Sequence, residues 1–398
     1  MIEQFEHGFS GLIGAKYAYS FWKGRVALHA ILKSAGIGPG DEVILPAFTC
    51  VVVPNAVSFV GATPVFVDIG PADYNLDPQQ IERLITRRTR ALLVQHTYGI
   101  PAALDSLLAI AKRHNLIVIE DCAHSLGSRY RGRHLGTFGD AAFFSSQWSK
   151  PFTTGLGGVA VTSNPELGKS LRAFQQQFVA PSGKSLIRLR VQHEIYRRLY
   201  TPRLYWRAVG VLRGLSRLNL FVPSSGKKEL ERVMPRDTFW RMSEFQSKIG
   251  LKRLSGVEEM VEHRVRLAQF YEEALRSRGW PVVPGLEQTK TVYLRYPVRV
   301  GNKWELLEKA STSRIELGSW FESVLHPIRD SLELFGYEAG RCPLAELAAN
   351  ESVNLPTHPG VTESEAERIL GFVLRYGTKT GLHDSSSKAL SATSVTQL

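Results

Sequence analysis

The chain has 398 residues, of which 43% are hydrophobic and 22% charged, and its formal net charge is +12. This composition is typical of a globular protein and excludes collagen-like and low-complexity chains. The length suits a large domain at residues 1–250 and a smaller one at 251–378, and the Ser/Thr-rich, aperiodic sequence of 379–398 predicts a disordered tail. Three widely spaced cysteines do not make a disulfide framework, and the first residues are too polar for a secretory signal, so we expect a cytoplasmic protein.

The first third of the chain alternates short apolar runs with amphipathic segments. A helix within residues 18–35 should begin at Gly24, where free backbone N–H groups form an anion site. We expect strands at 42–45, 64–68, 91–95 and 116–119, and helices at 54–61, 78–86 and 104–114. This alternation predicts an α/β fold with a mostly parallel sheet and helices on both of its faces.

Two charged residues follow apolar strands in the next stretch. Asp121 comes directly after the run 116–119, and Lys150 follows the run 141–144 and a short polar turn. Ligands of open α/β sheets bind at the carboxyl ends of the strands. A carboxylate there can pair with a pyridinium nitrogen, and a partly desolvated lysine can react with an aldehyde. Together they predict a pyridoxal phosphate site, with the cofactor phosphate at the Gly24 end.

Residues 181–235 form a basic insert, split by Pro202. Between Lys184 and Val222 it holds nine basic residues and one acid, so most of the net charge lies in one segment. This distribution excludes a broad nucleic-acid-binding face. Beyond the insert, the pattern predicts helices at 243–278, 304–311 and 365–376 and a strand at 291–300.

Six blocks of the sequence, in order, resemble the DegT/StrS family of sugar aminotransferases. They are LPAFTCVVVPNAVSFVGATPVFVDI, HTYGIPAALD, EDCAHSLG, GTFGDAAFFSSQWSK, RMSEFQSKIGLKRL and LPTHP, and they cover most of the chain. The resemblance implies the aspartate-aminotransferase fold, called fold type I, with a seven-stranded, mostly parallel sheet and a smaller C-terminal α+β domain. It also implies a homodimer that transfers an amino group from L-glutamate to a nucleotide-linked keto sugar for surface polysaccharide or glycoconjugate synthesis.

The resemblance also assigns roles within the site. Lys150 and Asp121 are then the catalytic residues, which bind the cofactor aldehyde and the ring nitrogen. The other cofactor-binding positions are Gly24, Arg25, Cys50, His124, Ser145 and Gln147. No metal is implied.

The sequence departs from the family pattern at three places. Lys23-Gly24-Arg25 stands where the family has a Ser-Gly-Thr type of triplet. Cys50 replaces an aromatic residue that stacks on the cofactor ring, so that support is missing or comes from elsewhere, for example His96 or Tyr98. Phe239 replaces an asparagine that reaches the phosphate in a neighbouring subunit.

Three functions fit these residues. The first is a pyridoxal-phosphate-dependent sugar aminotransferase. The second is a sugar dehydratase, which Lys150 disfavours because family members with that activity carry histidine there. The third is a non-catalytic scaffold or membrane-associated protein, which the departures at Cys50, Phe239 and Arg25 favour.

The insert has two interpretations of its own. Two helices flanking Pro202 would combine apolar and basic side chains, a composition typical of helices at a membrane surface, here the inner face of the membrane. Alternatively, the apolar residues pack on the partner subunit, and the arginines are solvated or bind an acidic nucleotide sugar.

Overall fold

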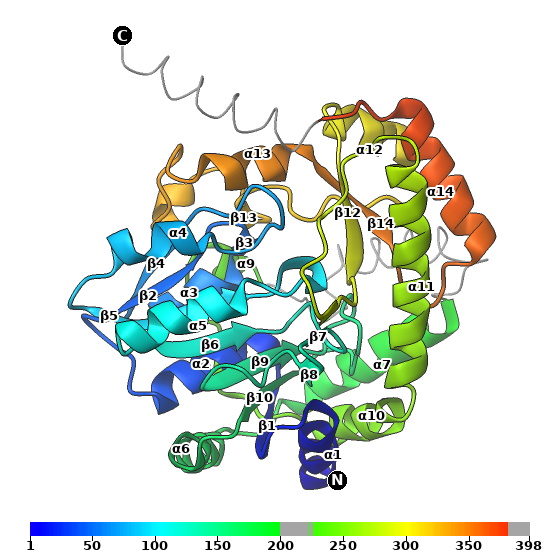
Figure 1. Cartoon of the computed structure of the whole chain (residues 1–398). Helices are drawn as coiled ribbons and strands as arrows, with labels where there is room; N and C mark the ends of the chain where they lie inside the picture. Colours follow the sequence, from blue (N-terminus) through cyan, green and yellow to red (C-terminus); the bar gives the residue numbers. More distant parts are fainter. Residues whose placement is uncertain (200–221, 223–225, 381–398) are drawn as a thin grey trace.

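The computed structural model describes residues 1–199, 222 and 226–380, and its centre is a seven-stranded sheet (Figure 1). The strand order is β1-β10-β9-β6-β5-β2-β4. The five strands from β9 to β4 are parallel, and β10 is antiparallel to both of its neighbours. The strands are β1 (Tyr17–Phe21), β2 (Glu42–Pro46), β4 (Thr63–Val67), β5 (Thr89–Gln95), β6 (Ile117–Asp121), β9 (Ala141–Ser145) and β10 (Gly158–Thr162). The predicted α/β fold with a mostly parallel sheet is confirmed.

Both faces of this sheet are buried, because helices cover each of them. Leu93 and Val43 belong to the core formed with α2 (Gly24–Ser34) and α3 (Val52–Phe59), whereas Leu92 and Val94 belong to the core formed with α1 (Ile2–Ile13) and α5 (Leu104–Arg113). Strands buried on both faces are continuous apolar runs, which is why the sequence pattern identified them. The predictions missed α1, β1 and α6 (Pro165–Gln175).

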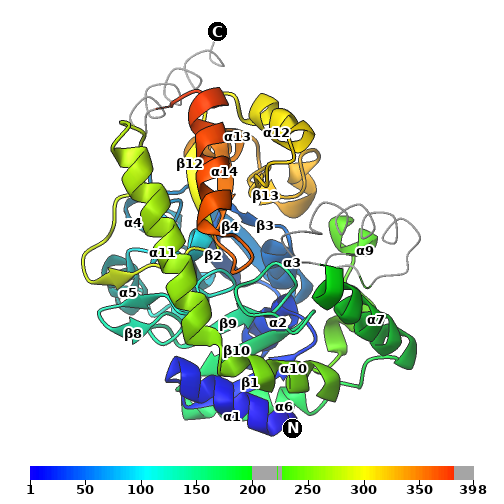
Figure 2. The same cartoon turned by 90° about the vertical axis from the view of Figure 1, so that its right-hand side faces the viewer.

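The C-terminal part packs beside the sheet and is built around the antiparallel pair β12 (Arg295–Arg299) and β14 (Ser352–Pro356). Its helices are α12 (Lys303–Thr312), α13 (Pro343–Glu351) and α14 (Glu363–Tyr376), and the long helix α11 (Val257–Arg276) runs along it (Figure 2). The predicted helix at 243–278 is in fact two helices, α10 (Glu244–Leu254) and α11, separated at Ser255–Gly256. The predicted strand at 291–300 is shorter and corresponds to β12.

Short elements complete the described chain. The predicted helix at 78–86 is only one α-helical turn, α4 (Pro78–Ile81), followed by the 3-10 turn Glu82–Leu84. Other 3-10 turns are Thr97–Gly99, Arg236–Phe239 and Leu332–Phe335. The short strands are β3 (Thr49–Cys50), β7 (Arg129–Tyr130), β8 (Arg133–His134), β11 (Thr289–Lys290) and β13 (Leu325–His326).

Two contacts tie the C-terminal part to the sheet. Asp68, directly after β4, accepts hydrogen bonds from the backbone N–H groups of Leu344 (2.9 Å) and Ala345 (2.8 Å). A carboxylate at the N-terminus of a helix stabilises the exposed N–H groups there, and Asp68 does so for α13 from a distant part of the chain. In addition, β13 pairs in parallel with β3. These contacts bring the loop before β13 to the carboxyl ends of the central strands.

Only part of the basic insert is described. Its helix α7 (Gly183–Leu199) packs on the same chain through Leu189, which is buried with Trp22 and Leu156. The return segment holds the short helix α9 (Lys227–Leu230). The second predicted helix of the insert and most of the predicted tail lie outside the described residues. No helix within the described part of the chain is both long and apolar enough to span a membrane.

Candidate active site

A cavity of about 330 Å³ opens at the carboxyl ends of β6 and β9. Its lining includes all eight predicted site residues, which are Gly24, Arg25, Cys50, Asp121, His124, Ser145, Gln147 and Lys150. The register explains how the two charged residues meet, because Asp121 at the end of β6 lies opposite Phe143 of β9. The chain after β9 then returns to the same edge and brings Lys150 there.

Asp121 is buried at the floor of this cavity, with only 4% of its surface exposed. One carboxylate oxygen accepts a hydrogen bond from the backbone N–H of Ala123 (2.9 Å). Burial raises the pKa of Asp121 to about 6, against the opposing effects of this hydrogen bond and of the Lys150 charge. A cationic N–H group placed against the carboxylate would favour its ionised form. Asp121 is therefore suited to hold a protonated ring nitrogen.

Lys150 is held in a turn in which its own N–H donates to the carbonyl of Gln147 (2.9 Å). Its Nζ lies 4.4 Å from the centre of the Trp320 ring. Burial lowers the pKa of Lys150 to about 8, because the charged amine loses hydration beside the aromatic wall. A larger fraction of the amine is thus neutral at physiological pH, which is the form that attacks an aldehyde.

The opposite end of the cavity is the N-terminus of α2. No side chain caps this helix, and its first turn contains no acidic residue. Gly24 lies so close to β9 that an added Cβ would be 2.9 Å from the Cβ of Ser145. The missing side chain leaves the first amides of the helix open beside the Ser145 hydroxyl, an arrangement typical of phosphate sites.

The two basic residues at this helix start are paired with two carboxylates, one in the return segment of the insert and one just after the insert. Lys23 Nζ lies 2.7 Å from a carboxylate oxygen of Asp237, and Arg25 Nη1 lies 2.5 Å from one of Glu229. The side chain of Glu229 is only 1% exposed. Arg25 lines the cavity as predicted, but part of its charge is balanced within the chain.

His124 and Cys50 line the same cavity as Asp121 and Lys150. Nδ1 of His124 accepts a hydrogen bond from the backbone N–H of Tyr98 (3.3 Å), and burial keeps the pKa of this imidazole well below its usual value. A neutral imidazole whose Nδ1 is an acceptor carries its proton on Nε2, which can donate to an oxygen in the cavity. Burial raises the pKa of the Cys50 thiol, so it does not supply a thiolate.

Aromatic lining comes from residues that the sequence analysis did not assign. Trp320, Phe321 and His326 line the cavity from the C-terminal part of the chain. Neither suggested ring support, His96 or Tyr98, lines it. Instead, the hydroxyl of Tyr98 donates to the backbone carbonyl of Trp320 and helps to hold that loop. These residues reach the cavity through the pairing of β3 with β13, which are far apart in the sequence. No local sequence pattern therefore marks them.

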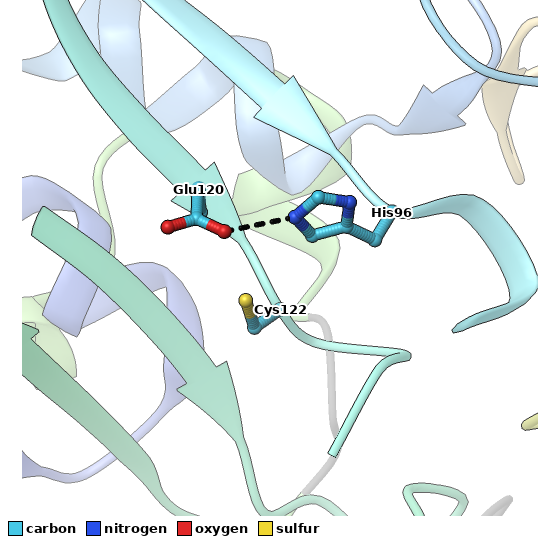
Figure 3. Close-up of side chains that lie close together, drawn as sticks. All are labelled: His96, Glu120 and Cys122. Carbon is cyan, nitrogen blue, oxygen red and sulfur yellow. Dashed lines mark hydrogen bonds and ion pairs between the residues drawn. The ribbon is translucent and has the colours of Figure 1, made fainter. Parts of the chain in front are cut away.

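Three buried residues next to Asp121 resemble a metal site but form a hydrogen-bond network (Figure 3). Nε2 of His96 lies 3.1 Å from Glu120, and Nδ1 of His96 accepts from the backbone N–H of Ala102 (3.1 Å). The proton is therefore on Nε2, where it is donated to the carboxylate. Burial raises the pKa of the third residue, Cys122, well above its usual value. A metal ion would have to displace these protons.

The same network positions the loop between β8 and β9. Glu120 also accepts hydrogen bonds from the backbone N–H groups of Gly136, Phe138 and Gly139, at 2.7–2.8 Å. It is thus fully satisfied although it is completely buried. The network fixes the end of β6 and, with it, the position of Asp121.

The donor set of the cavity fits pyridoxal phosphate. Asp121 can hold the ring nitrogen, Lys150 the aldehyde, and the start of α2 with Ser145 the phosphate. The fold and the cavity thus fit an enzyme of the pyridoxal-phosphate-dependent class. A solved structure with this fold is DesV from S. venezuelae, which is 29% identical, has a TM-score of 0.74, and matches 96% of this chain and 90% of that chain.

The chain belongs to the DegT/DnrJ/EryC1/StrS aminotransferase family, whose model matches residues 1–191 and 224–374. GDP-perosamine synthase from Caulobacter vibrioides is 34% identical over 93% of this chain and 88% of that protein. L-glutamine:scyllo-inosose aminotransferase from Streptomyces griseus is also 34% identical, over 82% of this chain and 70% of that protein. The family resemblance and the enzyme class predicted from the sequence are confirmed. Of the three functions considered, the family supports the aminotransferase.

The lowered pKa of Lys150 predicts how covalent capture of pyridoxal phosphate depends on pH. Because the neutral amine is the reactive form, the capture rate should rise about tenfold per pH unit below pH 8 and level off above it. Stopped-flow absorbance after mixing the cofactor-free protein with pyridoxal phosphate measures this rate. A rate that keeps rising toward pH 10 would mean that the amine has an ordinary pKa.

Proposed function

We propose that this chain is a pyridoxal-phosphate-dependent aminotransferase that transfers an amino group from an amino acid to a keto sugar carried by a nucleotide. The observation that carries the proposal is the meeting of Lys150 and Asp121 in one cavity with the open start of α2. The name of one relative, GDP-perosamine synthase, supports a nucleotide-linked sugar as the substrate class. The expected donor is L-glutamate, and the name of one relative gives L-glutamine, so both are candidates.

The residues of the cavity have separate roles in the proposed reaction. When bound, pyridoxal phosphate supplies an aldehyde and a ring that accepts the electrons released at the donor carbon. Asp121 would accept a hydrogen bond from the ring N–H and favour its protonated form. Nζ of Lys150, beside Trp320, would hold the aldehyde and is the group suited to move a proton at the donor carbon. Nε2–H of His124 could donate to an oxygen of the cofactor.

The wider setting of this proposal is synthesis of a surface polysaccharide or glycoconjugate in the cytoplasm. Division into a large domain at 1–250 and a small one at 251–378 stays a prediction. Contact of 184–222 with the inner face of the membrane also stays a prediction, because most of this segment lies outside the described residues. Burial of Leu189 against Trp22 favours the alternative that the insert packs on protein.

Replacing Lys150 tests the proposed function directly. Lys150→Ala should abolish both the visible absorbance of the bound cofactor and transamination, because the variant has no amine for the aldehyde. The fold should be intact, since Lys150 lines the cavity and not a hydrophobic core, and its turn is held by a backbone hydrogen bond. Absorbance spectra and amino transfer from L-glutamate or L-glutamine to a panel of keto-sugar nucleotides give the readouts. Unchanged turnover in this variant would refute the proposal.

Replacing Asp121 separates cofactor binding from catalysis. Asp121→Asn retains the hydrogen bond from Ala123 but cannot stabilise a protonated ring nitrogen. We expect cofactor to bind and the turnover number to fall about 100-fold. Asp121→Glu, which keeps the charge on a longer side chain, is the matched comparison. Activity close to that of the unmodified chain in the asparagine variant would assign the role to another group.

We also propose a homodimer with its active sites near the subunit interface. Support comes from two neighbouring exposed apolar residues, Val179 (58% exposed) and Phe239 (42% exposed), whose backbones are hydrogen-bonded to each other. Two adjoining exposed apolar side chains of this kind are suited to burial in a subunit interface. Light scattering should give twice the chain mass of 44.4 kDa, and Phe239→Glu should shift the protein toward monomer. An active monomer would contradict the proposal.

A further inference from the structure

A second and larger opening lies on the other side of Lys150, which lines both this opening and the cavity described above. This opening, the basic cleft, has a volume of about 820 Å³ and runs between α7, α10, α11, α14 and the start of β12. Seven of its lining residues are lysine or arginine and two are glutamate. The cleft therefore attracts anions to the reactive amine.

Most charged groups of the cleft are already engaged. Arg368 is paired with Glu365 (2.6 Å), and Glu316 lies 3.1 Å from His358. Arg197 is paired with Glu194 (2.8 Å), outside the cleft lining. The opposite charges within each pair largely cancel. An anion is therefore attracted mainly to the basic groups of the cleft that are not paired with a carboxylate.

Arg264 is engaged with the backbone instead of with a carboxylate. This arginine is buried, and its Nη1 donates to the carbonyls of Tyr293 (3.2 Å) and Leu294 (2.9 Å) and to the hydroxyl of Thr357 (2.8 Å). These bonds fix the chain directly before Arg295. Arg264 is thus a positioning residue for the first residue of β12.

Arg295 differs from these residues. It is only partly buried, and within the described part of the chain its guanidinium has no hydrogen bond or ion pair. The guanidinium packs against Gly318, where an added Cβ would be 2.9 Å from Nη1. Burial is the main cause of the lowered pKa of Lys150, and the charges of Arg25 and Arg295 add to it. Arg295 is therefore a pre-positioned cation that lines the same cleft as the reactive amine and has no partner among the described residues.

We propose that Arg295 is the receptor for the carboxylate of the amino donor. The inference rests on the proposed function and names the group that orients the donor at Lys150. A guanidinium presents two parallel N–H groups that match the two oxygens of a carboxylate. The Arg264 hydrogen bonds and the contact with Gly318 hold the guanidinium N–H groups of Arg295 in place before the amino donor binds.

Proximity favours the donor carboxylate over the diphosphate of a sugar nucleotide. In an α-amino acid, the nitrogen to be transferred and the carboxylate are bonded to the same carbon. In a nucleotide sugar, the ring of the sugar separates the reacting carbonyl from the diphosphate. A cation that lines the same cleft as Lys150 is thus suited to the carboxylate, whereas the diphosphate is better placed where Lys252 and Arg253 line the exposed part of the cleft.

The test compares two binding probes that do not depend on turnover. Glutarate, a dicarboxylate without an amine, reports the carboxylate site, and GDP, UDP and dTDP report a diphosphate site. Isothermal titration calorimetry with the cofactor-loaded protein gives the dissociation constants. Arg295→Gln should weaken glutarate binding about 100-fold and change nucleoside diphosphate binding less than about twofold.

Reactivity with the donor provides an independent readout. The absorbance change of the cofactor-loaded protein on adding L-glutamate or L-glutamine, without sugar, measures the donor reaction alone. Its apparent second-order rate constant should fall about 100-fold in Arg295→Gln and about tenfold in Arg295→Lys, which retains the charge without the two-pronged geometry. Gly318→Ala, which displaces the guanidinium without removing it, should also slow the reaction.

Matched controls separate this role from general effects. Lys112→Gln removes one charge from the exposed face of α5, away from the cleft, and should leave both readouts unchanged. Melting temperatures identify any variant that has lost its fold. Unchanged glutarate binding in Arg295→Gln, or a larger loss for nucleoside diphosphates than for glutarate, would overturn the proposal. If the unmodified chain reacts with no amino acid, the proposed function fails, and the glutarate measurement still decides whether Arg295 binds a carboxylate.

Discussion

The burial of two opposite charges at one edge of the sheet is the constraint on which the site depends. Removing an ionised group from water is unfavourable unless a partner compensates for the lost hydration. Asp121 has a single backbone N–H as hydrogen-bond donor, and Lys150 faces an aromatic ring. Their pKa values consequently move toward neutral pH from opposite directions, to about 6 and about 8, with burial as the largest cause in each case. A ligand with a protonated ring nitrogen and an aldehyde relieves both costs, which is why these residues suit pyridoxal phosphate.

The positions of the residues at the carboxyl-terminal edge of the sheet are fixed by buried polar groups that contact no ligand. Glu120 ties β6 to the loop before β9, and Tyr98 holds the backbone of Trp320. Lys303, only 1% exposed, donates to the carbonyls of Phe321 and Ala349 and so attaches the Trp320 loop to α13. Buried polar groups with all their hydrogen bonds satisfied specify one arrangement of the chain. The aromatic wall beside Lys150 is therefore set by contacts between segments that are far apart in the sequence.

The contrast between local strand patterns and contacts across distant segments explains how much of the fold and the site could be predicted from the sequence. The strands around Asp121 are continuous apolar runs, so the sheet and the position of this residue at its edge were accessible from local pattern. Lys150 was accessible because it follows the next such run. Trp320 and Arg295 were not, because their place at the site depends on the pairings β3–β13 and β12–β14, which leave no periodic signal near either residue. The N-terminal helix α1 was missed for a different reason: its apolar residues are interspersed with glycines and charges, although Phe5 and Phe9 are fully buried.

The phosphate end shows why counting charges along the sequence misjudges a site. Lys23-Gly24-Arg25 suggests two unopposed cations at the start of α2, but Asp237 and Glu229 lie against them. Glu229 lies in the return segment of the basic insert and Asp237 lies just after the insert, and Asn55 anchors the return segment by donating to the backbone carbonyl of Glu229 (2.7 Å). Leu230 of the same segment lines the cavity. Attraction of a phosphate therefore depends more on the uncapped amides of α2 than on the net side-chain charge. Because the return segment of the insert supplies Glu229 and Leu230, the insert is coupled to the cofactor cavity through charge as well as through packing.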